Sequence, residues 1–267
     1  MRFAQVDVFS ERPYGGNPVA VLLDAADLSD DRMREIARWT NLSETTFVLP
    51  PTHPDADYRV RIFTPFGELP FAGHPTLGTA HAWRENGGVA KRERIVQECA
   101  AGLITVRAGA HLSFAAPPTL RTGPLPSDMV ERIRAAIGVD IVDHQWVDNG
   151  PGWAAVQLAD ADAVRGVEPD FAVLGDIRLG LVGAQAPGAG CALEVRALFQ
   201  GTEDPVTGSL NASLAQWFYR AGKIDHDYVA AQGTRLGREG RVAVSRDADG
   251  TVWIGGSTVT CFSGTAR

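Results

Sequence analysis

A repeat with a constant offset of 135 residues constrains the fold of this chain more than any other feature of its sequence. The segments 61–74 and 196–209 align without a gap and share an arginine, a glutamate, a proline and a glycine. The matched residues are Arg61 with Arg196, Glu68 with Glu203, Pro70 with Pro205 and Gly73 with Gly208. Each copy has the pattern of a strand, a turn and a helix that begins near the glycine. The sequence therefore predicts two related α+β halves.

Strands and helices are mixed along the whole chain. Ala4, Val6 and Val8 alternate with polar residues, as in a half-buried strand. Ser29, followed by two aspartates, is typical of a helix N-cap. A proline-rich stretch begins at residues 116–118 and is the best candidate for a linker. We therefore place one half at residues 1–116 and the other at residues 117–267, with the last strand free to return to the first half.

Composition and charge exclude several classes of protein. The net charge is −7 and no block of Lys and Arg occurs, so we expect no nucleic-acid partner. Apolar runs stay far below the roughly 20 residues that span a bilayer, so we expect no membrane segment. The N-terminus alternates polar and apolar residues without the apolar stretch of a signal peptide. We therefore expect a cytoplasmic protein.

The sequence contains no motif for a metal or a nucleotide. Cys99, Cys191 and Cys261 are widely spaced, without the paired spacing of zinc ligands, so we expect small buried side chains. No G-x-G-x-x-G follows a strand, and the turn at Gly208 lacks the lysine of a phosphate-binding loop. We therefore predict that the protein has no cofactor and no metal.

The two turns of the repeat are suited to binding a carboxylic acid. A helix start offers free backbone N–H groups and a partial positive charge, and glycine lets a ligand approach the backbone. Two such starts facing each other in a cleft would hold a small acid from both sides, so we predict that Gly73 and Gly208 bind substrate. The polar residues beside them, His74, Asp204 and Ser209, are the candidates to act on that acid.

Several motifs resemble the phenazine biosynthesis PhzF-like family, and two of them contain the turns of the repeat. They run from the first predicted strand into the second half of the chain: residues 16–20 (GNPVA), 41–47 (NLSETTF), 63–65 (FTP), 68–76 (ELPFAGHPT) and 203–209 (EDPVTGS).

The resemblance implies a fold and a reaction. The fold has two pseudo-symmetric diaminopimelate epimerase-like domains, each a mixed sheet wrapped around a central helix, with the active site in the cleft between them. The type enzyme is a homodimeric, cofactor-free isomerase that moves a hydrogen on trans-2,3-dihydro-3-hydroxyanthranilate. Carried over by motif, the acid/base group is Glu44, assisted by His74, Asp204 and Ser209, and Asn17 contributes to substrate binding.

The chemistry of a shuttling carboxyl group agrees with this assignment, because burial raises the pKa of a glutamate and lets it retain a proton. We expect Leu42, Phe47 and Phe71 to surround Glu44 and supply that apolar environment. Two other features depart from the family pattern and bear on substrate shape: residues 210–213 after the second turn, and Trp153.

Three functions remain open at this point. The first is an isomerase of a small hydroxy or amino carboxylic acid, cyclic acids included. The second is an epimerase that works without thiols, because neither turn carries the cysteine that two-thiol racemisation requires. The third is a catalytically silent protein that binds small acids, which the presence of both Glu44 and Asp204 makes the weakest of the three.

Overall fold

The computed structural model describes residues 1–267, and the chain divides into two compact units. Unit 1 consists of Met1–Ala115 and Gly255–Arg267, and unit 2 consists of Ala116–Ile254. The boundary that the sequence suggested after residue 116 lies one residue from this division, and residues 255–267 belong to unit 1. The chain therefore passes from unit 1 into unit 2 after Ala115 and returns to unit 1 after Ile254.

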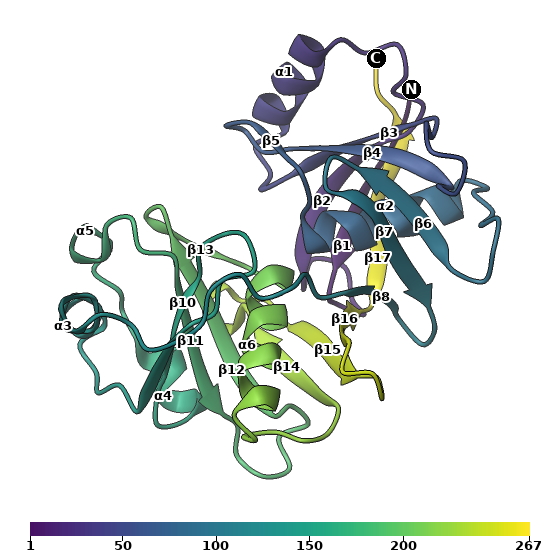
Figure 1. Ribbon diagram of the computed structural model, residues 1–267. Helices are drawn as coiled ribbons and strands as arrows, with labels where there is room; N and C mark the ends of the chain where they lie inside the picture. The colour runs from purple at the N-terminus through teal and green to yellow at the C-terminus, as the bar shows by residue number, and fades with distance from the viewer. The chain divides into compact units, whose positions relative to one another are not determined.

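Unit 1 is a mixed sheet with two helices (Figure 1). The strands are β1 (Arg2–Val8), β2 (Asn17–Leu22), β3 (Thr45–Leu49), β4 (Tyr58–Phe63), β5 (Glu68–Leu69), β6 (Ile95–Cys99), β7 (Gly102–Ala108), β8 (Leu112–Ala115) and β17 (Thr258–Thr265), and the helices are α1 (Asp30–Thr40) and α2 (Gly73–Glu85). Pairs β2–β3 and β4–β6 are parallel, whereas β1–β17, β1–β2, β3–β4, β4–β5, β6–β7 and β7–β8 are antiparallel.

Helix α2 is the central helix of unit 1, with strands on several sides of it (Figure 1). Nearly every residue of its first three turns is buried, as expected for a helix enclosed on all faces. Its buried hydroxyls are hydrogen-bonded to the surrounding strands: Thr79 Oγ1 donates to Thr46 Oγ1 at 2.8 Å, and Gln97 Nε2 donates to Thr76 Oγ1 at 2.9 Å. These bonds fix the helix inside the sheet and satisfy the hydroxyls of Thr76 and Thr79.

Unit 2 repeats this plan with additional helices. Its strands are β9 (Asp143–Trp146), β10 (Ala154–Gln157), β11 (Leu179–Ala184), β12 (Leu193–Phe199), β13 (Thr202–Asp204), β14 (Tyr228–Gln232) and β15 (Gly240–Arg246), and its helices are α3 (Ser127–Ile137), α4 (Ala161–Gly166), α5 (Phe171–Leu174), α6 (Gly208–Arg220) and the 3₁₀ turn η1 (Thr234–Leu236). Strand β16 (Val252–Gly256) carries the chain back to unit 1.

Helix α6 is the central helix of unit 2, and it is buried along most of its length. A methyl group placed on Gly180 of β11 would lie 2.5 Å from Leu210 Cδ1, which shows how closely the helix packs on the sheet. The other face of the strands packs against α3, α4 and α5, where Ile133, Val156 and Leu174 belong to one hydrophobic cluster.

The structure confirms the duplicated fold class. Helices α2 and α6 begin 135 residues apart, at Gly73 and Gly208, and they have the same length of 13 residues. The parallel pairs before them also correspond, with an offset of 134 residues, because Ala20 pairs with Thr45 in unit 1 and Ala154 pairs with Leu179 in unit 2. Each unit is a mixed sheet around a central helix, as the resemblance implied.

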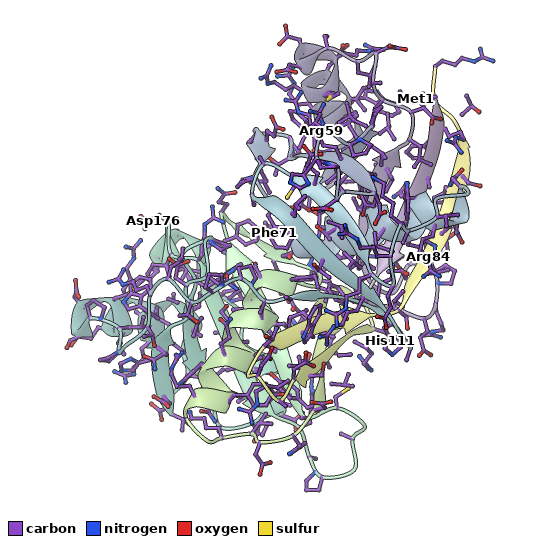
Figure 2. All side chains as sticks on the ribbon, turned by 45° about the vertical axis from the view of Figure 1, so that its right-hand side comes forward. Met1, Arg59, Phe71, Arg84, His111 and Asp176 are labelled. Atoms are coloured by element: carbon purple, nitrogen blue, oxygen red, sulfur yellow. The ribbon has the colours of Figure 1, made fainter.

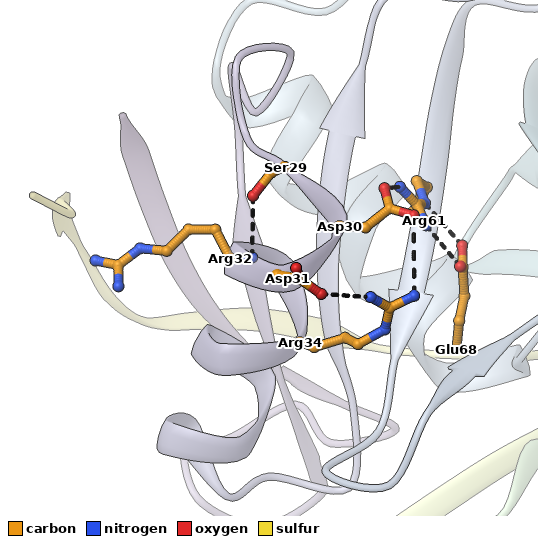
Figure 3. Close-up of polar contacts among 7 residues, drawn as sticks. All are labelled: Ser29, Asp30, Asp31, Arg32, Arg34, Arg61 and Glu68. Atoms are coloured by element: carbon orange, nitrogen blue, oxygen red, sulfur yellow. Dashed lines mark hydrogen bonds and ion pairs between the residues drawn. The ribbon is translucent and has the colours of Figure 1, made fainter.

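The arginine and glutamate of the repeat form an ion pair in each unit. In unit 1, Arg61 Nε and Nη2 bond to both carboxylate oxygens of Glu68 at 2.8 and 2.7 Å (Figure 3). The same guanidinium reaches Asp30 in the first turn of α1, whose N-cap, Ser29, accepts a bond from the backbone N–H of Arg32. The pair therefore ties β4, the turn at β5 and the start of α1 together.

The pair in unit 2 is more deeply buried. Arg196 and Glu203 expose 3% and 7% of their side chains, against 22% and 31% for Arg61 and Glu68. Arg196 Nη1 also donates to the carbonyls of Val164 and Val167 at the end of α4. The same two residues thus fix the turn that precedes α6.

Two remaining expectations concern the membrane and the thiols. No helix of the chain combines the length and the apolar character needed to cross a membrane. All three cysteines are free, but only Cys99 is buried. The expectation of buried side chains is wrong for Cys191 and Cys261, which are half-buried because one lies in the loop before β12 and the other in the largely exposed strand β17.

Candidate active site

Glu44 and His74 meet in unit 1. Glu44 is the last residue before β3, and His74 is the second residue of α2. The side chains expose 15% and 6% of their surface, and Glu44 Oε2 lies 3.3 Å from His74 Nε2. The strand and the central helix therefore bring together two residues that the sequence separates by three strands, β3, β4 and β5, and the loops between them.

His74 is neutral in this environment. Burial lowers its pKa to about 3, and a hydrogen bond with the backbone carbonyl of Pro18 offsets that effect only in part. A charged ion pair with Glu44 would require a protonated ring, which burial opposes, so we interpret the contact as a neutral imidazole facing a carboxyl group. Because one ring nitrogen donates to Pro18, the nitrogen that faces Glu44 is the one with the lone pair.

Asn17 lies next to this pair. It is the first residue of β2, it is buried, and the residue after it is the Pro18 that binds His74. The turn before it is fixed by the backbone N–H of Gly16, which donates to Asp7 Oδ2 at 2.9 Å. Asn17 thus has a fixed position beside two of the predicted catalytic residues.

The expected apolar surroundings of Glu44 need a correction. Phe47 lies in the hydrophobic cluster with Met33 and Ala37 of α1, whereas its neighbour Thr46 bonds to α2. Alternate residues of a strand point to opposite faces, so the Phe47 ring lies on the face away from α2 and His74. Phe71 packs edge-on against Phe114, with ring centroids 5.5 Å apart.

The starts of α2 and α6 have no side-chain cap. Their N-cap residues, Ala72 and Thr207, make no capping hydrogen bond, so the first backbone N–H groups of each helix are left for another acceptor. Gly73 is required by packing as well, because a methyl group there would lie 2.5 Å from the Phe114 ring. This arrangement suits a carboxylate ligand.

In unit 2, Asp204 is held by the turn that follows it. Thr207 Oγ1 donates to Asp204 Oδ2 at 2.5 Å, and Gln232 Nε2 donates to the backbone oxygen of Asp204 at 3.2 Å. Gln232 Oε1 accepts from the backbone N–H of Thr207 at 3.0 Å. A buried glutamine on β14 therefore links both sides of the turn.

Ser209 is held by a different segment. Trp153 Nε1 donates to its hydroxyl at 3.1 Å, and Asn149 Nδ2 donates to its backbone oxygen at 3.0 Å. Trp153 is buried and packs edge-on against Phe199. Asp204 and Ser209 thus lie at opposite ends of one turn and bond to different partners.

Sequence reasoning missed two kinds of residue here. Gln97 and Gln232 lie 135 residues apart and bond to Thr76 and Thr207 beside the two helix starts, so the repeat already contained this signal. Asn149 had no such signal, because its position follows only from the folding of a loop 60 residues before Ser209.

These features can be compared with known proteins. Residues 6–264 match the family described as phenazine biosynthesis-like protein. The chain belongs to the phenazine biosynthesis-like family. The match confirms the family that the motifs indicated.

Relatives in this family cover nearly the whole chain. Antisense-enhancing sequence 1 of Schizosaccharomyces pombe is 36% identical, over 98% of this chain and 97% of that protein. Trans-2,3-dihydro-3-hydroxyanthranilate isomerase of Pseudomonas aeruginosa is 35% identical, over 93% of this chain and 91% of that enzyme. The crystal structure of a PhzF family protein from Enterococcus faecalis matches with a TM-score of 0.84 at 26% identity, covering 100% of this chain and 98% of that chain.

The family relationship confirms the fold, and the named isomerases among the relatives confirm the enzyme class. The roles of Glu44, His74, Asp204 and Ser209 stay predictions. So do the homodimer, the cytoplasmic location and the absence of a cofactor. No group of three or more His, Cys, Asp or Glu side chains gathers in the arrangement of a metal site.

Proposed function

We propose that this chain is a cofactor-independent isomerase that moves a proton on a small hydroxy or amino carboxylic acid, with Glu44 as the acid/base group. The observation that carries the proposal is the contact of 3.3 Å between Glu44 Oε2 and His74 Nε2, in a setting where burial keeps the imidazole neutral. A neutral ring places no positive charge beside Glu44, so the carboxyl group can alternate between its ionised and its protonated form.

The proposed reaction needs only one group that shuttles a proton. The Glu44 carboxylate takes a proton from one carbon of the substrate, and the electron pair of that C–H bond forms a new double bond as the existing double bond shifts. The protonated carboxyl group then returns the proton to the carbon that gains electron density. Atoms and charge balance within the enzyme and one substrate molecule.

The other predicted residues position the acid. Uncapped backbone N–H groups at Gly73 and Gly208 would bind the substrate carboxylate, with Asn17 and Ser209 as further hydrogen-bonding groups. The hydroxyl of Ser209 already accepts from Trp153, so its own proton is available for a substrate oxygen. Asp204 carries a carboxylate that suits a substrate amine or hydroxyl.

The test is turnover by Glu44→Gln. The substrate of the Pseudomonas aeruginosa relative, trans-2,3-dihydro-3-hydroxyanthranilate, is the first compound to test, followed by other small unsaturated acids. Glutamine keeps the shape of the side chain but removes the titrating proton, so we expect turnover to fall by about 10²–10⁴-fold while binding survives. NMR in deuterated water separates the outcomes, because an isomerase moves a double bond and an epimerase inverts one carbon.

The matched control is Glu93→Gln, which makes the same chemical change at an exposed position outside the site. We expect this variant to retain wild-type turnover. If Glu44→Gln turns over the substrate as fast as Glu93→Gln does, Glu44 has a structural role and the proposed mechanism is wrong.

A further inference from the structure

Unit 2 contains a pocket that the proposed reaction does not use. Its volume is about 440 Å³, and its lining includes Arg178, Trp146, Pro151 and Gly152. Two of these residues belong to the loop 148–153, the loop that also holds Ser209. One loop therefore lines the pocket with Pro151 and Gly152 and also bonds to the start of α6.

The loop is rigidly shaped. The carboxylate of Asp148 accepts hydrogen bonds from the backbone N–H groups of Gly150 and Gly152, at 2.8 and 2.7 Å. Gly152 has a φ of +86°, a conformation that side chains other than glycine rarely adopt. One face of this loop contributes Asn149 and Trp153 to Ser209, and Pro151 and Gly152 line the pocket.

Arg178 is the unpaired cation of this pocket. Arg178 is half-buried, its guanidinium makes no hydrogen bond and no ion pair with the chain, and it lies 5.5 Å from the centroid of the Phe199 ring. Arg132 in the same pocket is already satisfied, since it donates to the carbonyl of Val173 and pairs with Asp176. A guanidinium with five donors and no acceptor in the protein suits an anionic ligand.

The carboxylates at the pocket do not neutralise Arg178. Asp176, labelled in Figure 2, exposes 93% of its side chain and is paired with Arg132. Asp128 is also exposed and forms no ion pair with Arg178. Carboxylates in such exposed positions are screened by water and contribute at most about 1 kcal/mol each. The lining thus carries two arginines and two aspartates, and Arg178 is the arginine without an ion pair.

Aromatic rings connect Arg178 to Ser209. The guanidinium lies over Phe199, the Phe199 and Trp153 centroids are 5.8 Å apart, and Trp153 donates to the Ser209 hydroxyl at 3.1 Å. Strand pairing gives Arg178 the position equivalent to Glu44. Phe47 pairs with Arg61 and Leu181 pairs with Arg196, and Glu44 and Arg178 each lie three residues before these strand residues. The segment that carries the acid/base group in unit 1 thus carries an arginine in unit 2.

We propose that Arg178 and the pocket it lines bind a second anionic group of the substrate, so that the enzyme acts on acids with two anionic groups. This inference rests on the proposed function, because it assigns the other end of the same substrate to Ser209 and the start of α6. The class of substrate is therefore a dicarboxylate, or a carboxylic acid with another oxyanion in the second position.

Binding measurements with simple acids test the proposal without turnover. Calorimetric titrations compare butyrate, which has one carboxylate, with succinate, glutarate and adipate, which scan the distance between two. We expect wild-type protein to bind at least one of the three dicarboxylates about tenfold or more tightly than butyrate. A wild-type protein that shows no such preference overturns the proposal.

Variants then locate the second anion. Arg178→Gln should reduce the preference to less than about threefold, and Arg178→Lys should restore part of it, because a charge is present again. Arg134→Gln is the matched control, since it removes one positive charge from an exposed position on α3 outside the pocket, and it should keep the full preference. Retention of the preference in Arg178→Gln contradicts the proposal.

A last variant distinguishes a substrate subsite from an isolated anion site. Ser209→Ala should weaken dicarboxylate binding if one ligand spans from Ser209 to Arg178. If Ser209→Ala binds the dicarboxylates as wild type does, the anion binds at Arg178 alone and the substrate subsite is refuted. A negative result in this series leaves the turnover test of Glu44 untouched, and wild-type turnover by Glu44→Gln leaves these binding results standing.

Discussion

At the scale of single residues, the protonation of His74 follows from burial. A charged imidazole loses hydration in this position, and the one hydrogen bond to Pro18 does not replace it, so the pKa falls from 6.5 to about 3. The unfolded chain therefore binds a proton at mildly acidic pH that the folded chain does not bind. Neutral His74 stabilises the fold fully above pH 6.5, and this stabilisation is lost as the pH falls toward 3.

This linkage gives a prediction for His74→Asn. Between pH 6.5 and 4, the free energy of unfolding of the wild type should fall more steeply than that of the variant, by about 1 kcal/mol per pH unit. Urea unfolding at a series of pH values measures the difference. His111→Asn, at an exposed side chain whose hydrogen-bond partner is the hydroxyl of Ser257, should keep the wild-type slope. A wild type that gains stability relative to His74→Asn on acidification would show a true ion pair with Glu44.

The motifs identified Glu44 and His74 from the sequence, but the contact between them could not be read there. The contact depends on how β3 lies beside α2, and the sequence did not show which residues of β3 point toward α2. Phe47 was expected near Glu44, yet the alternation along β3 directs Phe47 toward α1 and Thr46 toward α2. Strand periodicity gives two faces, and only the packed structure shows which face meets which helix.

At the scale of elements, the two arginine–glutamate pairs are an internal comparison. Both hold the turn before a central helix, but Arg196 and Glu203 are nearly enclosed, whereas Arg61 and Glu68 are partly exposed. Removing one partner of a buried pair leaves an uncompensated charge away from water, which is far more costly than loss of an exposed pair. The same substitution should therefore have different effects in the two units.

We expect Arg196→Met to lower the free energy of unfolding by about 3–5 kcal/mol, because Glu203 is left charged and buried. Arg61→Met should cost only about 1 kcal/mol, because water reaches Glu68 and Asp30. Urea midpoints measure both effects, and hydrogen exchange assigns each to a unit. Equal losses in the two variants would show that burial does not set the strength of these pairs.

The repeat predicts those elements whose structure is determined by residues close to one another in the sequence. The turn residues, the starts of α2 and α6 and the strands before them follow from residues close in sequence. The hydrogen-bond partners of Ser209 cannot be predicted from such neighbouring residues. Asn149 and Trp153 lie on a loop whose shape depends on Asp148 and two glycines. Long-range contacts of this kind decide the chemistry of the site, and a single sequence does not contain them.

At the scale of the whole molecule, the duplication raises the question of how many ligands one chain binds. Both central helices begin without a side-chain cap, at Gly73 and Gly208, so each start could bind a carboxylate by itself. Two independent sites would take two ligands per chain. The proposed function instead requires one ligand that uses both helix starts, since the acid/base pair belongs to unit 1 and Ser209 to unit 2.

We therefore expect one ligand per chain. The probe is 3-hydroxyanthranilate, an aromatic acid that resembles the substrate of the Pseudomonas aeruginosa relative but has no double bond to move. Calorimetry should give a stoichiometry of one. Hydrogen exchange should show that the amides at the starts of α2 and α6 gain protection at the same ligand concentration, because a single binding event orders both. Protection at two different concentrations, or a stoichiometry of two, would mean that the halves bind acids independently. A shared proton transfer by Glu44 on a ligand held by Ser209 would then be untenable.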